Sequence, residues 1–83
     1  MFYDNLTTHR VAAGIKVAEL VRLSGVAETT IRRIEKHEAS TEETITKIIN
    51  ALNETKFHSK NPIDPRKEIK KKSRFGSSLQ VAA

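Results

Sequence analysis

The sequence predicts a compact all-α domain of four to five helices, followed by a basic C-terminal tail that we expect to be partly disordered. Apolar residues recur at helical spacing through the first two thirds of the chain. Hydrophobic residues make up 37% of the chain, yet only one tyrosine and three phenylalanines occur, which suits a helical domain better than a β-sandwich. A chain of 83 residues allows one small domain with a modest core.

The first helix is expected at the N-terminus. Residues 2–13 can form a helix with Phe2, Leu6 and Ala13 facing inward. Gly14 follows as a suitable C-terminal stop.

The next segment predicts two short helices joined by a tight turn. Its apolar residues recur at helical spacing and change phase at Gly25. Helices at about 16–23 and 27–36 that share one apolar seam across a short turn must cross steeply, which is the geometry of a helix-turn-helix. Gly25 suits the turn because a positive φ there would strain a side chain. The seam residues are Leu20, Val21, Leu23, Val26, Ile31 and Ile34.

A fourth helix is expected at about 41–52. Ser40 and Glu43 match a capping box at its start, and Asn53 is a plausible left-handed stop. Its apolar residues follow the spacing of one buried helix face: Ile45, Ile48, Ile49 and Leu52.

The residues of this pattern resemble a known family. The run GIKVAELVRLSGVAETTIRRIE, followed by STEETITKIINAL, is similar to the lambda repressor and Cro type (XRE-like) helix-turn-helix domains of phage and bacterial regulators. The resemblance spans residues 6–52 without a gap and includes the turn glycine and the Ile-x-x-Ile-Glu ending. It implies a compact lambda repressor-like DNA-binding domain that inserts helix 27–36 in the major groove.

The resemblance also implies a set of DNA contacts. Arg32 or Arg33 is expected to grip a guanine, and Lys16 or the nearby backbone amides to hold a phosphate. Glu28 has two interpretations, because it can accept a bond from a cytosine amine or serve only as a charge at the helix N-terminus. A merely solvated helix face is the alternative for the whole set. The candidate residues are Lys16, Ala27, Glu28, Thr29, Thr30, Arg32, Arg33 and Lys36.

One structural ion pair follows from the same resemblance. In the family, an arginine near the end of the first helix pairs with the glutamate at the end of the recognition helix, the helix that enters the major groove and corresponds to 27–36 here. Arg10 and Glu35 occupy these positions, so we expect an ion pair between them. The alternative is that Arg10 is only a solvated charge.

Charge divides the chain into a helix-turn-helix domain, residues 1–55, and a basic C-terminal extension, residues 56–83. The first part holds seven Lys and Arg against eight Asp and Glu, a net charge of −1, and the second holds eight against two, a net charge of +6. The cations of the extension would attract phosphates without sequence preference, or serve only to solubilise a tail. Phe57 and Ile63 are expected to fold back on the core, as a fifth helix or a dimer contact.

A last helix is predicted within the extension. Asp64 and Pro65 form a good helix start, so a helix over 65–74 is expected, with Gly76 as its stop. Ile69 is almost its only apolar residue, so such a helix would be marginal alone. We expect it to be disordered or to depend on a partner.

Several kinds of function are not expected. The chain has no cysteine, and His9, His37 and His58 stand far apart, so we expect no metal site and no cofactor. There is no glycine-rich phosphate loop and no recognisable nucleophile-base pair, so we do not expect an enzyme. No apolar run is long enough to span a bilayer and the N-terminus does not resemble a signal peptide, so the expected location is the cytoplasm.

Together these features predict a sequence-specific transcriptional regulator that binds double-stranded DNA. We expect a repressor of phage, plasmid or mobile-element type that blocks polymerase. The family resemblance also implies a homodimer on an inverted-repeat operator, because one such head contacts too few bases for useful specificity. Two alternatives stay open: an antitoxin-like protein whose extension binds a protein partner, and a nonspecific DNA-binding protein that relies on its basic extension.

Overall fold

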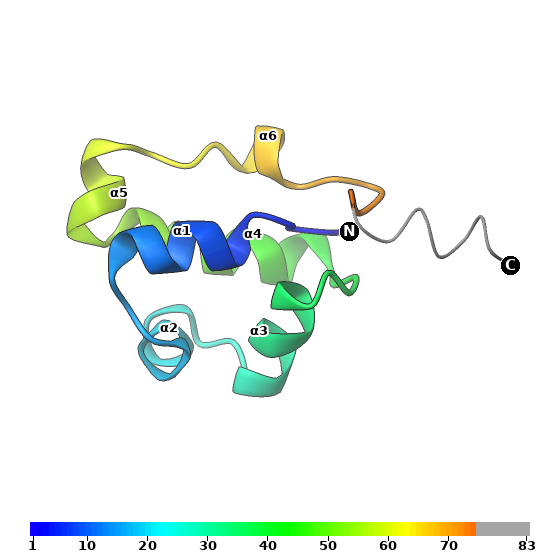
Figure 1. Cartoon of the computed structure of the whole chain (residues 1–83), viewed down its shortest axis with the longest axis horizontal. Helices are drawn as coiled ribbons and strands as arrows, with labels where there is room; N and C mark the ends of the chain where they lie inside the picture. Colours follow the sequence, from blue (N-terminus) through cyan, green and yellow to red (C-terminus); the bar gives the residue numbers. More distant parts are fainter. Residues whose placement is uncertain (75–83) are drawn as a thin grey trace, which may run out of the picture.

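The computed structural model describes residues 1–74, and the regular elements in that range are helices, as predicted (Figure 1). An isolated antiparallel bridge joins Phe2 to Lys70. No helix within residues 1–74 is both long and apolar enough to cross a membrane. The elements are α1 (Leu6–Ala13), α2 (Val17–Ser24), α3 (Glu28–Glu35), α4 (Glu42–Asn53), α5 (Lys56–Lys60) and α6 (Pro65–Glu68).

Helices α1 and α4 form a central layer that separates two groups of elements. Figure 1 shows α2 and α3 on one side of this layer and α5, α6 and the chain between them on the other. The contacts agree, because α2 packs on α3 and α4, whereas α5 packs on α1 and α4. The residues expected to contact DNA and the basic residues of α6 therefore lie on opposite sides of the molecule.

One apolar core holds the helices together. The four residues predicted as the buried face of α4 are fully buried: Ile45, Ile48, Ile49 and Leu52. They belong to one cluster with Leu20 of α2 and Ile31 and Ile34 of α3, which are also fully buried. Burial of one such side chain contributes roughly 1.5–3 kcal/mol, so this cluster is the main source of folding free energy in a small chain.

Two glycines end helices in the left-handed conformation. Gly14 follows α1 with φ 72°, and Gly25 follows α2 with φ 74°, so the predicted stop at Gly14 and the predicted positive φ at Gly25 are confirmed. The Gly25 amide donates to the Val21 carbonyl at 2.9 Å. An added Cβ would meet no atom within 4 Å at either glycine, so the positive φ is what favours glycine there.

The first helix is shorter than predicted. It begins at Leu6 because the preceding residues have other partners. The Phe2 amide donates to the Lys70 carbonyl at 2.8 Å, and the Lys70 amide donates back at 2.9 Å. Tyr3, which the sequence did not single out, is the fully buried aromatic residue here, and Ala13 is only partly buried.

The predicted capping box of the fourth helix is wrong. Thr41 is the N-cap of α4, and its hydroxyl accepts the Thr44 amide at 3.1 Å. Ser40 instead lies before the cap and donates its amide to the Met1 carbonyl at 2.7 Å. The cap therefore sits one residue later than the capping box requires, and Glu43 has no part in it.

The predicted left-handed stop at Asn53 is also wrong, because Asn53 is the last residue of α4. Its side-chain oxygen accepts the Ile63 amide at 2.8 Å, and its side-chain nitrogen donates to the Ile63 carbonyl at 3.1 Å. These two hydrogen bonds hold the returning chain on α4, and Ile63 is buried, as expected. Phe57, the other residue expected to fold inward, is 45% exposed.

The helix predicted over 65–74 is wrong in length. Only Pro65–Glu68 is helical, and Asp64 caps it as predicted. The helix ends because Ile69 adopts an extended backbone, with φ −78° and ψ 118°, and packs against the core. Through residue 74 the extension thus lies against the N-terminal segment instead of standing apart, while the predicted stop at Gly76 lies outside the described residues.

Asp4 ties this returning chain to the body of the protein. Its side chain is 3% exposed and accepts the Ser73 hydroxyl at 2.8 Å and the Arg74 amide at 2.6 Å. The Asp4 carboxylate also lies 3.2 Å from Nδ1 of His37, in the loop after α3. Burial raises the pKa of Asp4, but the hydrogen bonds from Arg74, Ser73 and His37 outweigh it and hold the pKa below its usual value.

We predict that Asp4 makes the stability of the protein depend on acid pH. A carboxylate whose pKa is lowered by folding stabilises the fold fully above its ordinary pKa of 3.8 and loses this effect as the pH falls through the folded-state pKa. Asp4→Asn should lower the free energy of unfolding at neutral pH by roughly 1.5–3 kcal/mol. The difference from the unsubstituted protein should shrink below about pH 4, as measured by urea unfolding at a series of pH values.

Glu38→Gln is the matched control for Asp4→Asn. Glu38 is an exposed acid in the same loop as His37 and forms no ion pair within residues 1–74. Its substitution should change the free energy of unfolding by less than about 0.5 kcal/mol. A loss that is equal in the two variants would contradict the role given to Asp4.

Candidate nucleic-acid interface

Helix α3 presents a polar face to solvent because its apolar residues point to the core. Ile31 and Ile34 are fully buried. Ala27 is the N-cap, and its carbonyl accepts the Ile31 amide at 3.1 Å. The helix therefore covers Glu28–Glu35, within one residue of the predicted range at each end. Thr30 is half-buried, whereas the exposed candidates on this element are Ala27, Glu28, Thr29, Arg32, Arg33 and Lys36.

The spacing of these exposed residues places four of them on one helix face. Residues that are three, four and seven positions apart on a helix are neighbours on its surface. Thr29, Arg32, Arg33 and Lys36 follow this spacing. The exposed face of α3 thus carries the Thr29 hydroxyl and three cations, with the exposed Glu28 carboxylate beside Arg32.

The expected ion pair between Arg10 and Glu35 is confirmed. Nε of Arg10 lies 2.7 Å from Oε2 of Glu35, and the two side chains are 18% and 15% exposed. Nη1 of Arg10 also donates to the Ile15 carbonyl at 2.9 Å. One guanidinium thus joins α1, the connection to α2 and the end of α3.

A second ion pair lies on the exposed face of α3 itself. Nε of Arg32 lies 2.7 Å from Oε2 of Glu28, four residues earlier, and both side chains are more than half exposed. Such an exposed pair contributes little to stability, but it occupies both groups. Arg33 and Lys36, in contrast, form no ion pair within residues 1–74.

Lys16 lies at the start of α2, as its N-cap, with an exposed side chain. Its carbonyl accepts the amides of Glu19 and Leu20, both at 3.1 Å. The first amides of a helix have no partner within the helix, so they can bind an anion. A shallow hollow of about 420 Å³ opens beside them, lined by Gly14, Lys16, Ala18, Glu19 and Arg22.

His37 joins the end of α3 to the N-terminal segment, which the sequence did not predict. Its amide donates to the Ile34 carbonyl at 2.9 Å, and it is the one non-glycine residue within 1–74 with a positive φ, 69°. A left-handed backbone costs such a residue roughly 1–2 kcal/mol. The contact of its ring with Asp4 helps to offset this cost.

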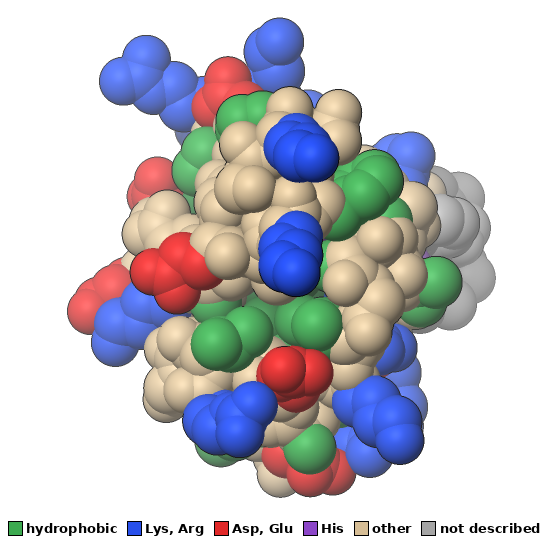
Figure 2. All heavy atoms as spheres, turned by 90° about the vertical axis from the view of Figure 1, so that its left-hand side faces the viewer, with side chains coloured by type: hydrophobic (Ala, Val, Ile, Leu, Met, Phe, Trp, Pro, Cys, Tyr) green, Lys and Arg blue, Asp and Glu red, His purple; other side chains and the backbone are tan. Residues whose placement is uncertain are grey.

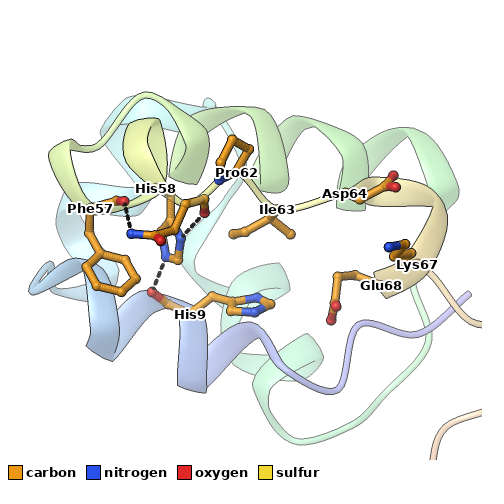
Figure 3. Close-up of a pocket in the computed structure, with 9 residues that line it drawn as sticks. His9, Phe57, His58, Pro62, Ile63, Asp64, Lys67 and Glu68 are labelled. Carbon is orange, nitrogen blue, oxygen red and sulfur yellow. Dashed lines mark hydrogen bonds between the residues drawn. The ribbon is translucent and has the colours of Figure 1, made fainter.

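A polar hollow between α1, α5 and α6 was also not predicted (Figure 3). Its volume is about 320 Å³. His58 is 2% exposed, and its Nε2 lies 2.8 Å from the His9 carbonyl, while its Nδ1 lies 3.3 Å from the Asn61 carbonyl. A carbonyl oxygen can only accept a hydrogen bond, so in the shorter contact Nε2 of His58 donates to the His9 carbonyl. His58 thereby holds α5 on α1.

The ring of His9 lines the same hollow, and Figure 3 shows it on the side that also carries Glu68. Its Nδ1 is hydrogen-bonded to the Tyr3 hydroxyl. Burial lowers the pKa of His9, against the opposing charge of Glu68, and burial raises the pKa of Tyr3. Within the described residues, no cluster of three or more His, Asp or Glu side chains is arranged to hold a metal ion.

Exposed apolar side chains lie in several parts of the surface. Val11 is 63% exposed, Phe57 45% and Leu23 40%. The prediction that Leu23 belongs to the apolar seam of α2 and α3 is therefore wrong. Figure 2 looks at the end of the molecule formed by α5 and the connection between α1 and α2, where small groups of apolar side chains alternate with charged ones. The homodimer expected from the sequence stays a prediction.

No protein-family model matches this chain, and neither a curated protein nor a solved structure shows significant similarity to it. The function must therefore rest on the residues and geometry of the chain itself.

We predict that the Arg10–Glu35 pair contributes measurably to stability. Arg10→Ala leaves Glu35 and the Ile15 carbonyl without their donor, so it should lower the free energy of unfolding by roughly 1.5–3 kcal/mol. Arg32→Ala breaks an ion pair of the same length on the exposed face of α3, and it should cost less than about 1 kcal/mol. Urea unfolding of both variants tests this, and equal losses would contradict the structural role of Arg10.

Proposed function

We propose that this protein is a sequence-specific regulator of the lambda repressor and Cro type that binds double-stranded DNA through α2 and α3. The pairing of these two helices carries the proposal. Each spans eight residues, and left-handed Gly25 stands at their turn. Their apolar faces share one core, so α3 is left with an exposed polar face. A helix with such a face can enter a major groove, which is about 12 Å wide.

Arg33 is the residue that we assign to base contact. It lies on the exposed face of α3 and has no ion-pair partner within residues 1–74. A free guanidinium can donate two parallel bonds to the edge of a guanine. Arg32 is less suited to this role, because it would first have to leave Glu28. Thr29 stands one turn before Arg33, where its methyl group can meet a thymine.

Helix α2 would hold the DNA backbone beside the groove. Lys16 and the free amides at the start of α2 offer a positive site for one phosphate. Phosphate contacts of this kind fix the orientation of the protein without reading sequence. Two copies of the domain on an inverted repeat would cover a promoter and block polymerase, which gives repression by occlusion.

We predict that Arg33 decides sequence preference. The test needs the preferred site, which selection from a random duplex library at physiological salt supplies; failure to enrich any sequence would contradict the proposed function. Arg33→Ala should weaken binding to that site by roughly 1–3 kcal/mol, about 5- to 150-fold in Kd. Binding to random duplexes should hardly change. Fluorescence anisotropy with both duplexes measures the two affinities.

Lys60→Ala is the control for Arg33→Ala. Lys60 is an exposed cation of α5, across the central layer from α3. Its substitution should leave both affinities within about twofold of the unsubstituted protein. Equal losses on both duplexes for Arg33→Ala would mean that Arg33 touches only phosphate.

We predict that Glu28 does not read a base. Its carboxylate is held by Arg32, and it would stand close to negative phosphates. Glu28→Gln should therefore strengthen binding to preferred and random duplexes alike, by up to about tenfold at low salt, and leave the preferred bases unchanged. Repeating the library selection with this variant tests whether Glu28 reads a base. Glu54→Gln is the control, because Glu54 is an exposed acid at the C-terminal end of α4. Loss of preference for one C·G pair would show instead that Glu28 accepts a cytosine amine.

A further inference from the structure

The segment from Asp64 to Arg74, here called the strap, carries more positive charge than α3. It contains two acidic residues, Asp64 and Glu68, and six exposed basic residues. The basic residues are Arg66, Lys67, Lys70, Lys71, Lys72 and Arg74.

Both acidic residues of the strap are engaged within the protein. The Asp64 carboxylate accepts the Arg66 amide at 3.0 Å and so caps α6. The Glu68 carboxylate accepts the side-chain amide of Asn5 at 2.8 Å. The cations from Arg66 to Lys72, in contrast, form no ion pair within residues 1–74, so the outward charge of the strap is positive.

The strap is attached to the N-terminal segment at two points. The backbone of Lys70 exchanges two hydrogen bonds with Phe2, and the buried hydroxyl of Ser73 donates to Asp4. A segment that served only to solubilise the chain would need no such anchors. Their effect is to hold the lysines on a surface of defined position, which lowers the entropy cost of binding an anionic partner.

The side chains of these cations line two separate hollows beside the strap. One shallow hollow, of about 280 Å³, is lined by Arg66 and Lys71 among others, and a second, of about 270 Å³, by Lys67, Lys70 and Arg74. The one large apolar side chain between them, Ile69, packs against the core. The strap within this range therefore offers charge without an exposed aromatic platform, which suits a phosphate backbone better than unstacked bases.

The strap and the recognition helix face different directions. Figure 1 shows α6 across the α1 and α4 layer from α2 and α3. One helix is about 10 Å in diameter, so a straight duplex seated on α3 cannot also reach α6. A phosphate backbone bound by the strap must then belong to a second duplex.

The geometry points to a second DNA-binding surface on the strap, through which one molecule bridges two duplexes. This inference rests on the proposed function for the first duplex, which α2 and α3 hold. The strap supplies sequence-independent attraction, because its cations would displace counterions from any duplex.

A bead capture assay tests the bridge. Protein is bound to an immobilised duplex that carries its preferred site, and capture of a labelled random duplex from solution is measured against salt. A variant with Lys70→Gln, Lys71→Gln and Lys72→Gln should capture at least about tenfold less of the second duplex, and the slope of log affinity against log salt should fall by up to about 2.7. Its binding to the immobilised site should stay close to that of the control.

The control variant has the same change in charge elsewhere: Lys47→Gln, Lys56→Gln and Lys60→Gln, at exposed positions of α4 and α5. Equal capture by the two variants, or no capture by the unsubstituted protein, overturns the inference. So does a polyglutamate chain that competes as well as duplex DNA, because the surface would then accept any acidic polymer. The proposed function is judged separately, by the effect of Arg33→Ala on the immobilised site.

Discussion

The burial of one face of α4 is the contact on which the rest of the fold depends. Its four apolar residues at 45, 48, 49 and 52 are fully buried, and α1, α2 and α5 all pack on this helix. Helix α3 is different, because its main contacts are with α1 and α2. The position of α3 therefore depends on α1 and α2, which both pack on α4. A chain of 83 residues can bury little further apolar surface, so polar contacts must complete the arrangement.

Those polar contacts join the N-terminal part of the chain to the end of α3 and to the strap. Arg10 joins α1 to the end of α3 through Glu35, and His37 joins the following loop to Asp4. Asp4 in turn holds Ser73, so the N-terminal segment is shared between α3 and the strap. A buried polar group without a partner costs roughly 1–3 kcal/mol, which is why such a contact specifies one arrangement more strictly than apolar packing does. The geometry of the proposed recognition helix thus depends on residues far from its exposed face.

The exposed face of α3 and the strap differ in their balance of acidic and basic side chains. On α3, Glu28 pairs with Arg32, so Arg33 and Lys36 are the exposed cations of this face that form no ion pair within residues 1–74. A sparse set of donors discriminates between sequences but gives modest attraction. The strap has the opposite balance, because its six exposed cations outnumber its two acids, of which Asp64 caps α6 and Glu68 bonds to Asn5. Under the proposed function, sequence preference and general affinity for DNA would come from separate surfaces.

The sequence by itself determined the helical class, the buried face of α4, the two left-handed glycines and the Arg10–Glu35 pair. The first three follow from local rules, since periodicity and backbone conformation are set by neighbouring residues, and the pair followed from the family resemblance. Only the tertiary structure decided that Tyr3 is buried, that Asn53 holds Ile63 and that the extension returns to Asp4. These contacts join residues that are distant along the chain, up to 70 positions apart for Asp4 and Arg74. Local propensity favoured a helix over 65–74, but burial of Ile69 and pairing with Phe2 stabilise an extended strap instead.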